Sequence, residues 1–261
     1  MIPSFHWWRT VFWLIPAISV YTIVLGAISL ASVLVDRRGR TAHWCARTWS
    51  WLILATTGVR VRTSGVDRVP DGSYVFVSNH QSIYDIPILF ANMPFQLRII
   101  AKASLGLFPV LGWHLRCAGH LLVDRSRAGV STLRQVARLV SHGHSLVVFP
   151  EGTRSVDGRV GRFKGGLFLV AVESGLPVVP VAVVGSRHVM RKGRLMTCPG
   201  DVELVVHTPI QTAGLGRQDV RSLAQRVHAV VAATVSSRSS HVDRLNVAPP
   251  EPASRQMGLE E

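Results

Sequence analysis

The sequence predicts an α/β domain in which a mostly parallel sheet is flanked by helices, with an N-terminal membrane-embedded helical segment. From Val59 onward, short apolar runs alternate with amphipathic stretches, which is the pattern of strands joined by crossover helices. Before them, no formally charged residue occurs between Arg9 and Asp36. The predicted organisation is an anchor with an interfacial helix (residues 1–58), a globular domain (59–237) and a flexible C-terminal tail (238–261).

The uncharged N-terminal stretch is long enough to cross a bilayer. As a helix it would extend roughly 39 Å at 1.5 Å per residue, against a hydrocarbon core of about 30 Å. It exceeds the apolar core of a signal peptide and no small-residue cleavage site follows it, which indicates a retained anchor. Pro16 is expected to kink the helix or to end it near residue 15, so a shorter embedded hairpin is one alternative. A buried helix of a soluble core is the other.

Residues on both sides of this stretch favour a membrane location. Arginines follow it at once and place the downstream domain on the cytoplasmic face under the positive-inside rule: Arg37, Arg38 and Arg40. Tryptophans at both edges resemble interfacial aromatic belts: Trp7, Trp8, Trp13, Trp44, Trp49 and Trp51. Residues 44–57 are therefore expected to form a second helix at the membrane surface.

The globular domain is expected to contain several short strands and three helices. The strand candidates are apolar runs at residues 74–78, 97–101, 120–123, 145–149, 178–184 and 202–207. The helix candidates have apolar residues at helical spacing and cover residues 131–141, 163–174 and 217–235. The final stretch from Arg238 is polar and rich in proline, which is typical of a tail that need not fold.

The charge balance indicates an anionic partner. Basic residues outnumber acidic ones 29 to 15, giving a net charge of +14. Such an excess suits nucleic acid, membrane headgroups or a phosphorylated substrate. No nucleic-acid-binding motif is recognisable, so nucleic acid is not expected as a partner. The three cysteines are scattered and the histidines lack His-Glu-x-x-His spacing, so neither a disulfide scaffold nor a metal site is expected.

The first chemical motif is Ser-Asn-His-Gln-Ser-Ile-Tyr-Asp at residues 78–85, directly after a predicted strand. This order places His80 at the carboxyl end of the strand, where active groups of α/β sheets gather. Histidine can act as a general base near neutral pH, and a carboxylate on its other nitrogen fixes the tautomer. Residues five apart on one helix diverge by roughly 140°. Asp85 must therefore reach back from the first helical turn to His80 in the preceding turn. Helix capping by Asn79 or Ser82 is the alternative.

The second motif is Gly-His-Leu-Leu-Val-Asp-Arg at residues 119–125. After a predicted strand, Arg125 would offer a guanidinium at the same sheet edge as His80. The planar guanidinium suits phosphate because it makes two charge-assisted hydrogen bonds at once. A surface arginine paired with Asp124 is the alternative.

The third motif is Phe-Pro-Glu-Gly-Thr-Arg-Ser at residues 149–155, again after a predicted strand. Gly152 permits a tight turn whose N–H groups can bind an oxyanion or a phosphate. Arg154 and Lys164 would add positive charge. The spacing of a Walker loop is absent, so nucleotide hydrolysis is not expected.

Together these motifs, followed by Leu-Pro-Val-Val-Pro-Val-Ala at residues 176–182, resemble the four sequence blocks of the glycerolipid acyltransferases. Within that family the chain is most similar to the 1-acylglycerol-3-phosphate acyltransferases. The resemblance implies a glycerol-3-phosphate acyltransferase-like fold with His80 and Asp85 as the catalytic pair, and associates the fourth block with the acyl pocket. It implies that the acceptor is bound by Arg125, Glu151, Gly152, Thr153 and Arg154. Lys164 stands in a Lys-Gly-Gly run where the family usually has Lys-Lys-Gly, and is expected to add to the same site.

The resemblance implies an O-acyltransferase. It would transfer a fatty acyl group from a thioester, acyl-CoA or acyl carrier protein, to the free hydroxyl of 1-acylglycerol 3-phosphate (lysophosphatidic acid), forming phosphatidic acid at an anionic membrane surface. His80 would act as the base, with no acyl-enzyme and no cofactor beyond the co-substrate. The alternative acceptors are glycerol 3-phosphate, a lysophospholipid and a lyso-ornithine lipid. A catalytically silent lipid-binding protein is the non-enzymatic alternative, and the intact His80, Asp85 and Arg154 argue against it.

Overall fold

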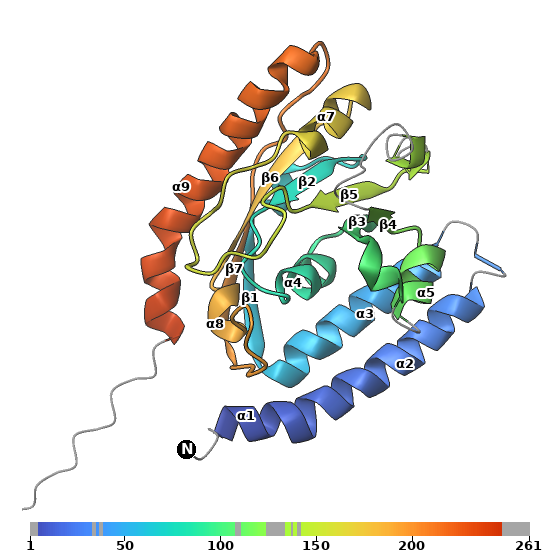
Figure 1. Cartoon of the computed structure of the whole chain (residues 1–261), viewed down its shortest axis with the longest axis vertical. Coiled ribbons are helices and arrows are strands. Elements are labelled where there is room, and N and C mark those ends of the chain that lie inside the picture. The colour runs from blue at the N-terminus through green and yellow to red at the C-terminus, as the bar shows by residue number, and fades with distance from the viewer. Residues whose placement is uncertain are drawn as a thin grey trace, which may run out of the picture.

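The computed structural model describes residues 5–32, 35–36, 39–107, 111–123, 134–136, 138–139 and 142–246. A seven-stranded sheet lies between two layers of helices, and a long N-terminal helix runs along one side of the molecule (Figure 1). The strands are β1 (Val59–Ser64), β2 (Val75–Ser78), β3 (Leu97–Lys102), β4 (Leu121–Val123), β5 (Ser145–Val148), β6 (Val178–Val184) and β7 (Gly200–Val206).

The strand order in the sheet is β1-β7-β6-β2-β5-β3-β4. Only the β6–β7 pair is antiparallel among the described strands, and the other pairs are parallel. The mostly parallel sheet predicted from the sequence is therefore confirmed, and each predicted strand is present within a few residues. The sequence analysis missed β1, where Arg60 and Arg62 alternate with valines. This strand lies at the edge of the sheet and only its first residue is buried, which explains its weak apolar signal.

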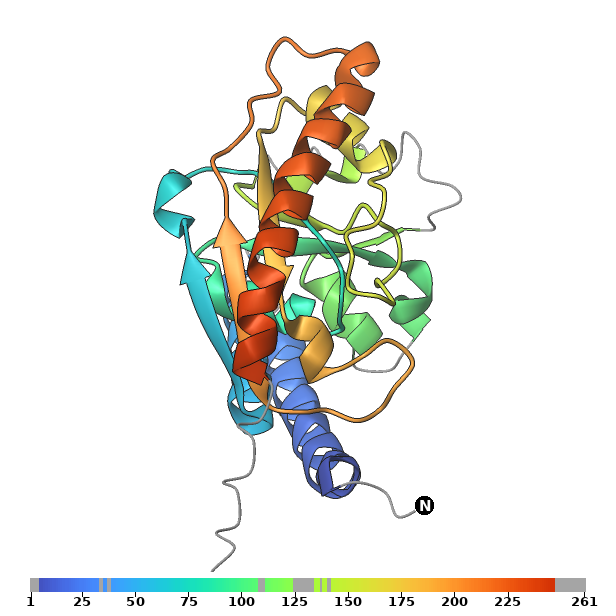
Figure 2. The same cartoon turned by 90° about the vertical axis from the view of Figure 1, so that its left-hand side faces the viewer.

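Helices cover both faces of the sheet. They are α3 (Arg40–Thr57), α4 (Asp85–Asn92), α5 (Leu111–Cys117), α7 (Gly166–Glu173), α8 (Ser186–Val189) and α9 (Val220–Asn246), with short 3₁₀ turns at Val66–Arg68, Ala103–Leu107 and Arg217–Asp219. Alternate residues of β2 pack against the helices on opposite faces of the sheet, because successive side chains of a strand point to opposite faces. Phe76 packs in the core on the side of α3 and α4, whereas Val75 and Val77 pack in the core on the side of α7 and α9. Figure 2 shows α9 lying across its face of the sheet.

The C-terminal helix is longer than the sequence predicted. The expected tail began at Arg238, but α9 continues to Asn246. Val242 is fully buried against the core, and the Asn246 side chain exchanges hydrogen bonds with the backbone N–H and C=O of Asp201 at 2.7 and 3.0 Å. Tertiary packing thus extends the helix through residues 238–246. Residues 247–261 of the predicted tail lie outside the described residues, as do parts of the predicted helix 131–141, of which 134–136 and 138–139 are helical.

The N-terminal helix is continuous past Pro16. It consists of α1 (Phe5–Arg9), a π-helical turn (Thr10–Leu14) and α2 (Ile15–Ser32). Proline cannot donate a backbone hydrogen bond and crowds the preceding turn, and the wider turn directly before Pro16 accommodates it. Of the two outcomes expected at Pro16, a kink or an end near residue 15, the end is not observed, because the helix continues to Ser32. By length and composition, Phe5–Ser32 is the one described helix that could cross a membrane.

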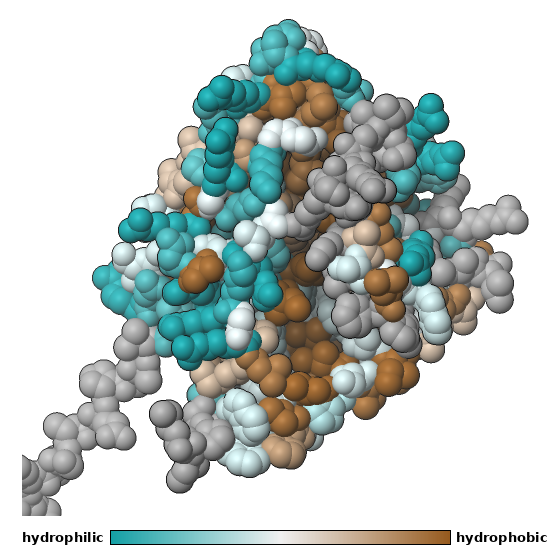
Figure 3. Space-filling view, in the orientation of Figure 1, coloured by the Kyte–Doolittle hydropathy of each residue, from teal (hydrophilic) through white to brown (hydrophobic). Residues whose placement is uncertain are grey.

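The helices α2 and α3 lie side by side (Figure 1). Tyr21 Oη lies 3.1 Å from Thr56 Oγ1, and Trp49 Nε1 donates to Thr22 Oγ1 at 2.9 Å. The outer side of the N-terminal helix exposes apolar side chains: Phe12 and Trp13 in the π-helical turn, and Val20, Ile23, Val24 and Ile28 in α2. Figure 3 shows apolar surface gathered along these N-terminal helices, in contrast to the polar surface of α9. The second helix predicted at residues 44–57 is present as α3, which begins four residues earlier, at Arg40.

The segment between α8 and β7 contacts the N-terminal helix. Thr197 N donates to Thr10 Oγ1 at 3.0 Å. Arg9 donates through Nη2 to the carbonyl oxygens of Thr57 and Thr197, at 3.2 and 3.4 Å. The N-terminal helix is therefore fixed to the α/β domain by polar contacts as well as by its packing on α3.

Candidate active site

His80 and Asp85 meet at the carboxyl end of β2. Because β2 ends at Ser78 and α4 begins at Asp85, His80 lies in the connecting turn and Asp85 in the first helical turn. His80 Nδ1 lies 2.7 Å from Asp85 Oδ2. This is the arrangement that their spacing predicted. The N-cap residue of α4, Tyr84, makes no side-chain cap hydrogen bond, whereas Ser82 Oγ accepts the Tyr84 N–H at 3.3 Å in the preceding turn. Asn79 does not cap the helix, because its side chain exchanges two hydrogen bonds of 2.8 Å with the backbone of Val183 in β6.

The Asp85 carboxylate is fully buried and surrounded by hydrogen-bond donors. Besides His80, Oδ2 accepts the backbone N–H groups of Gln81 at 2.7 Å and Ser82 at 2.9 Å. The other oxygen, Oδ1, accepts the hydroxyl of Ser186 at 2.5 Å. A buried charge is stable only when its lone pairs are used in this way. The donors also fix the direction in which the carboxylate faces the imidazole.

The imidazole of His80 is held on its flat side by Phe149. The two rings stack with centroids 4.2 Å apart and planes 23° from parallel. The His80 side chain is 15% exposed. Since Nδ1 faces a carboxylate, it carries the proton, which leaves the lone pair on Nε2. The ring is thus oriented with one nitrogen bound and the other available as a base.

Glu151 ties the third motif to the first. Its Oε1 accepts the backbone N–H of His80 at 2.8 Å and its Oε2 accepts that of Gly161 at 3.0 Å. In the opposite direction, Ser155 N donates to the carbonyl oxygen of His80 at 2.7 Å. Burial raises the pKa of Glu151, and the two backbone N–H groups oppose that shift. Both oxygens of Glu151 are therefore used within the protein.

The turn after Glu151 has the left-handed backbone that its glycine permits. Gly152 has a φ of +77°, a conformation that costs other residues energy. Its N–H donates to the carbonyl oxygen of Phe149 at 3.2 Å. The expectation that this turn offers N–H groups to an anion is therefore not met by Gly152 itself, whose N–H closes the turn.

Arg154 and Lys192 provide the positive charge at this turn. Within the part of the chain that the structure describes, the guanidinium of Arg154 has no hydrogen-bond acceptor and is half-buried. Lys192, from the segment after α8, donates through Nζ to Thr153 Oγ1 at 2.9 Å and to the carbonyl oxygen of Arg154 at 3.1 Å. Lys192 thus stabilises the turn that presents Arg154 and adds a second cation beside it.

Lys164 is exposed, and its backbone N–H donates to the carbonyl oxygen of Pro150 at 3.1 Å, which places the residue beside the third motif. Arg125 lies outside the described residues, so the structure does not place it relative to His80. The strand that precedes Arg125, β4, is present at the edge of the sheet.

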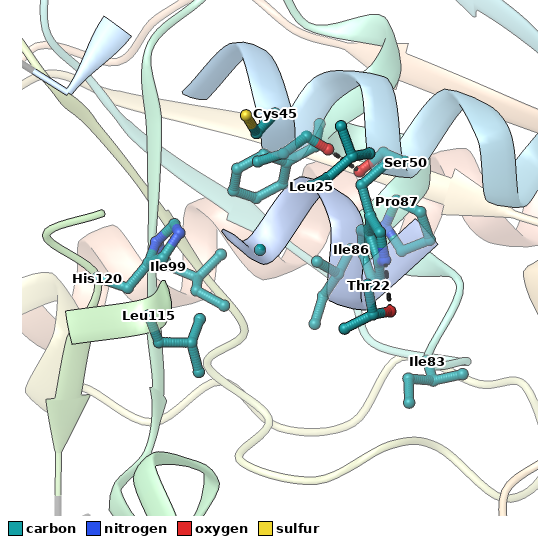
Figure 4. Close-up of a pocket in the computed structure, with 14 residues that line it drawn as sticks. Thr22, Leu25, Cys45, Ser50, Ile83, Ile86, Pro87, Ile99, Leu115 and His120 are labelled. Atoms are coloured by element: carbon teal, nitrogen blue, oxygen red, sulfur yellow. Dashed lines mark hydrogen bonds between the residues drawn. The ribbon is translucent and has the colours of Figure 1, made fainter. Parts of the chain in front are cut away.

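An apolar cavity adjoins the turn that carries His80. It has a volume of about 200 Å³ and lies between α2, α3, α4, β3 and α5 (Figure 4). Ile83 and Ile86, which flank Asp85 in the chain, line one end, and Ile83 is 53% exposed. Leu25, Ile99 and Leu115 line it farther along. The site therefore combines a histidine–aspartate pair, a cationic turn and an apolar cavity.

Four parts of this site were not predicted from the sequence. Ser186 and Lys192 approach from the segment after β6, more than 30 residues from the groups they contact, and no motif marks either of them. The cavity is also formed by elements far apart in the sequence. Phe149 is the first residue of the third motif, so the sequence did place it near the site. Its stacking on His80 could not be predicted from that position.

The motifs lie in a region that matches a family model described as Acyltransferase, over residues 60–184. A chloroplastic 1-acyl-sn-glycerol-3-phosphate acyltransferase from Brassica napus is 35% identical over 184 residues, which are 68% of this chain and 53% of that protein. The 1-acyl-sn-glycerol-3-phosphate acyltransferase of Pseudomonas aeruginosa is 31% identical over 216 residues, 81% of each chain. This chain thus spans about half the length of the first relative and most of the second.

The fold has a solved counterpart. The crystal structure of the 1-acyl-sn-glycerophosphate (LPA) acyltransferase from Thermotoga maritima superposes with a TM-score of 0.70 and 28% sequence identity. The match covers 84% of this chain and 94% of that one. It therefore extends well beyond the four motifs, and the predicted fold class is confirmed.

Proposed function

Because this chain belongs to the acyltransferase family that includes the 1-acyl-sn-glycerol-3-phosphate acyltransferases, we propose that it acylates 1-acylglycerol 3-phosphate. The donor is a thioester, acyl-CoA or acyl carrier protein, and the products are phosphatidic acid and a free thiol. The observation that carries this proposal is the 2.7 Å contact between His80 Nδ1 and the buried Asp85 carboxylate, with the other imidazole nitrogen available.

The proposed reaction is a direct transfer. His80 Nε2 takes the proton of the acceptor hydroxyl while its oxygen attacks the thioester carbonyl carbon. The C–S bond then breaks, and the imidazolium returns the proton to the departing thiolate. Asp85 holds the Nδ1–H and stabilises the imidazolium, and base assistance of this kind is worth about 10²–10⁴ in rate. The mechanism uses no acyl-enzyme.

The cationic turn is proposed to bind the phosphate of the acceptor. Arg154 has no hydrogen-bond acceptor among the described residues, so its guanidinium can make two bonds to phosphate oxygens without breaking others. The turn is joined to the His80 backbone by Glu151 and Ser155. A phosphate bound there would hold the acceptor at a fixed position relative to the base, which favours transfer by positioning.

The apolar cavity is proposed to hold an acyl chain. Its lining is almost entirely apolar, and its Ile83 end lies three residues along the chain from His80. The adjoining α2 exposes a continuous apolar side, which we propose lies in the cytoplasmic leaflet. Lipid substrates could then reach the site from the membrane, while the thioester comes from the cytoplasm. The net charge of +14 suits an anionic leaflet.

The decisive test measures thiol release and lipid product with the purified full-length protein in lipid vesicles. The panel combines two donors, acyl-CoA and an acyl-loaded carrier protein, with four acceptors. The acceptors are lysophosphatidic acid, glycerol 3-phosphate, a lysophospholipid and lyso-ornithine lipid. Thiol release that depends on lysophosphatidic acid is the expected result. Transfer only to another acceptor would reassign the acceptor, and no transfer to any would overturn the enzymatic proposal.

A pair of histidine variants tests the base. His80→Ala is expected to lower kcat at least 100-fold, because it removes the only proton acceptor assigned to the hydroxyl. His241→Ala, on the exposed side of α9, is the matched control and is expected to keep wild-type activity. His80→Ala activity above a tenth of wild type would contradict the base assignment.

A further inference from the structure

We propose that Ser186 is a positioning residue of the acyl transfer, whose hydroxyl fixes the Asp85 carboxylate in the orientation that His80 requires. The inference rests on the proposed function and adds to it a residue outside the four sequence motifs. Ser186 does not touch the reacting atoms. It acts through Asp85, and Asp85 acts through His80.

The hydrogen bonds of Asp85 divide unequally between its two oxygens. Oδ2 accepts from His80 Nδ1 and from the backbone N–H groups of Gln81 and Ser82. Within the described part of the chain, the donor to Oδ1 is the Ser186 hydroxyl. Both side chains are fully buried, so water does not readily replace this donor. Without the hydroxyl, Oδ1 is left as a buried charged acceptor.

The backbone around Ser186 is fixed in place. Gly185 has a φ of +95°, and a Cβ at this position would overlap Val242 of α9 and lie 2.8 Å from the carbonyl oxygen of Asp201. Only glycine suits this turn, which ends β6 and points Ser186 at the first turn of α4. On the catalytic side, Asn79 is bound to Val183 in β6 by two hydrogen bonds. The segments 79–85 and 183–186 are therefore joined at both ends.

The functional consequence follows from the geometry of a carboxylate. Its two oxygens move together, so a donor on Oδ1 restrains rotation and keeps Oδ2 directed at the imidazole. Loss of the donor would allow the carboxylate to rotate, which weakens its support for the imidazolium. We expect the loss of this donor to lower activity by about 10- to 100-fold, the range that applies to partners orienting the histidine and carboxylate ligands of metal sites. The effect is expected in kcat, because substrate binding does not use Ser186.

A substitution series separates the hydroxyl from its volume. Ser186→Ala removes the donor, Ser186→Cys keeps a similar size with a weak donor, and Ser186→Thr keeps the hydroxyl. We expect kcat to fall about 10- to 100-fold in Ser186→Ala and Ser186→Cys, with recovery in Ser186→Thr and unchanged KM for both substrates. Ser145→Ala, which removes another buried hydroxyl that accepts Tyr74 N at 3.1 Å, is the matched control for folding and is expected to keep wild-type kcat.

A spectroscopic measurement tests the contact independently of turnover. The downfield proton resonance of His80 Nδ1–H, identified by its loss in His80→Ala, reports the bond to Asp85 and is expected to shift or broaden in Ser186→Ala but not in Ser145→Ala. An unchanged resonance, or wild-type kcat in Ser186→Ala, would overturn the proposal while leaving the proposed function intact. Wild-type protein that transfers no acyl group would instead overturn the function, and with it the catalytic role of Ser186.

Discussion

The side-chain carboxylate of Glu151 binds the backbone of His80 and not its imidazole. Its Oε1 accepts the His80 N–H at 2.8 Å, across 71 positions of sequence, while Oε2 accepts Gly161 N at 3.0 Å. One carboxylate therefore joins the turn that carries His80 to both ends of the loop that carries Arg154. The resemblance to the family implied that Glu151 binds the acceptor, whereas its contacts within the chain favour a role in joining the two motifs.

Replacing Glu151 by glutamine tests that role. Glu151→Gln turns one acceptor oxygen into an NH₂ group, so one of the two backbone N–H groups faces a donor. We expect the free energy of unfolding to fall by about 1–3 kcal/mol and kcat to fall with it. Urea unfolding and steady-state kinetics measure both. Glu173→Gln, which removes a surface pair with Arg217, is the control and is expected to cost less than about 1 kcal/mol. A rise in acceptor KM alone would favour acceptor binding instead.

Removing the guanidinium of Arg154 tests the phosphate site. Arg154→Ala is expected to raise the KM for lysophosphatidic acid by about 10- to 100-fold, which is the value of one or two charge-assisted hydrogen bonds. Activity toward a monoacylglycerol, which lacks the phosphate, is expected to stay unchanged. Arg159→Ala, an exposed arginine of the same loop, is the matched control. An increase confined to the KM of the thioester would show that the guanidinium binds the donor.

Filling the cavity tests the acyl site. Ala46 lines it from α3, so Ala46→Phe is expected to shift the donor preference toward shorter acyl chains by reducing the volume of about 200 Å³. Ala55→Phe adds the same ring to an exposed position of the same helix and is expected to leave the preference unchanged. Competition between donors of different length measures the shift. Equal preferences in both variants would exclude this cavity as the acyl site.

The buried His144 is expected to make stability depend on pH. Burial, together with Arg98 and His142, lowers the pKa of His144 from 6.5 to about 4. As pH falls below 6.5, the unfolded chain gains the proton before the folded one, so stability is lost progressively from pH 6.5 toward 4. Urea unfolding of His144→Gln is expected to show a weaker dependence in this range. Part of the pH dependence that remains in the variant is expected from His43, whose pKa is also lowered to about 4. Identical slopes of unfolding free energy against pH for wild type and variant would contradict the role of His144.

The contact between His80 and Asp85 could be predicted from the sequence because only the end of a strand and the start of a helix separate the two residues. Contacts from Phe149, Glu151 and Ser186, which are distant in sequence, then fix the orientation of the pair. The central strands were predictable for a similar reason, since burial on both faces requires continuous apolar runs such as the one in β6. The fold class and the candidate base are therefore both indicated by local patterns in the sequence.

The remaining features depend on contacts between distant segments. Ser186 meets Asp85 across 101 positions, and neither residue's neighbours in sequence indicate the other. The end of α9 was misplaced because the sequence from Arg238 onward is polar and rich in proline, which is typical of a tail that need not fold. The buried Val242 and the hydrogen bonds of Asn246 to Asp201 stabilise the helix beyond that point. Arg125 lies outside the described residues, and its place beside His80 stays a prediction.

Thr22, Leu25 and Gly26 of α2 form one wall of the apolar cavity. A shortened enzyme that begins after Ser32, the obvious route to a detergent-free preparation, would therefore expose the cavity to water and lose the bonds from Arg9 to Thr57 and Thr197. The selectivity for acyl-chain length measured on such a truncated protein would report on a cavity that lacks one wall. Biochemical comparisons of donors require the N-terminal helix to be retained.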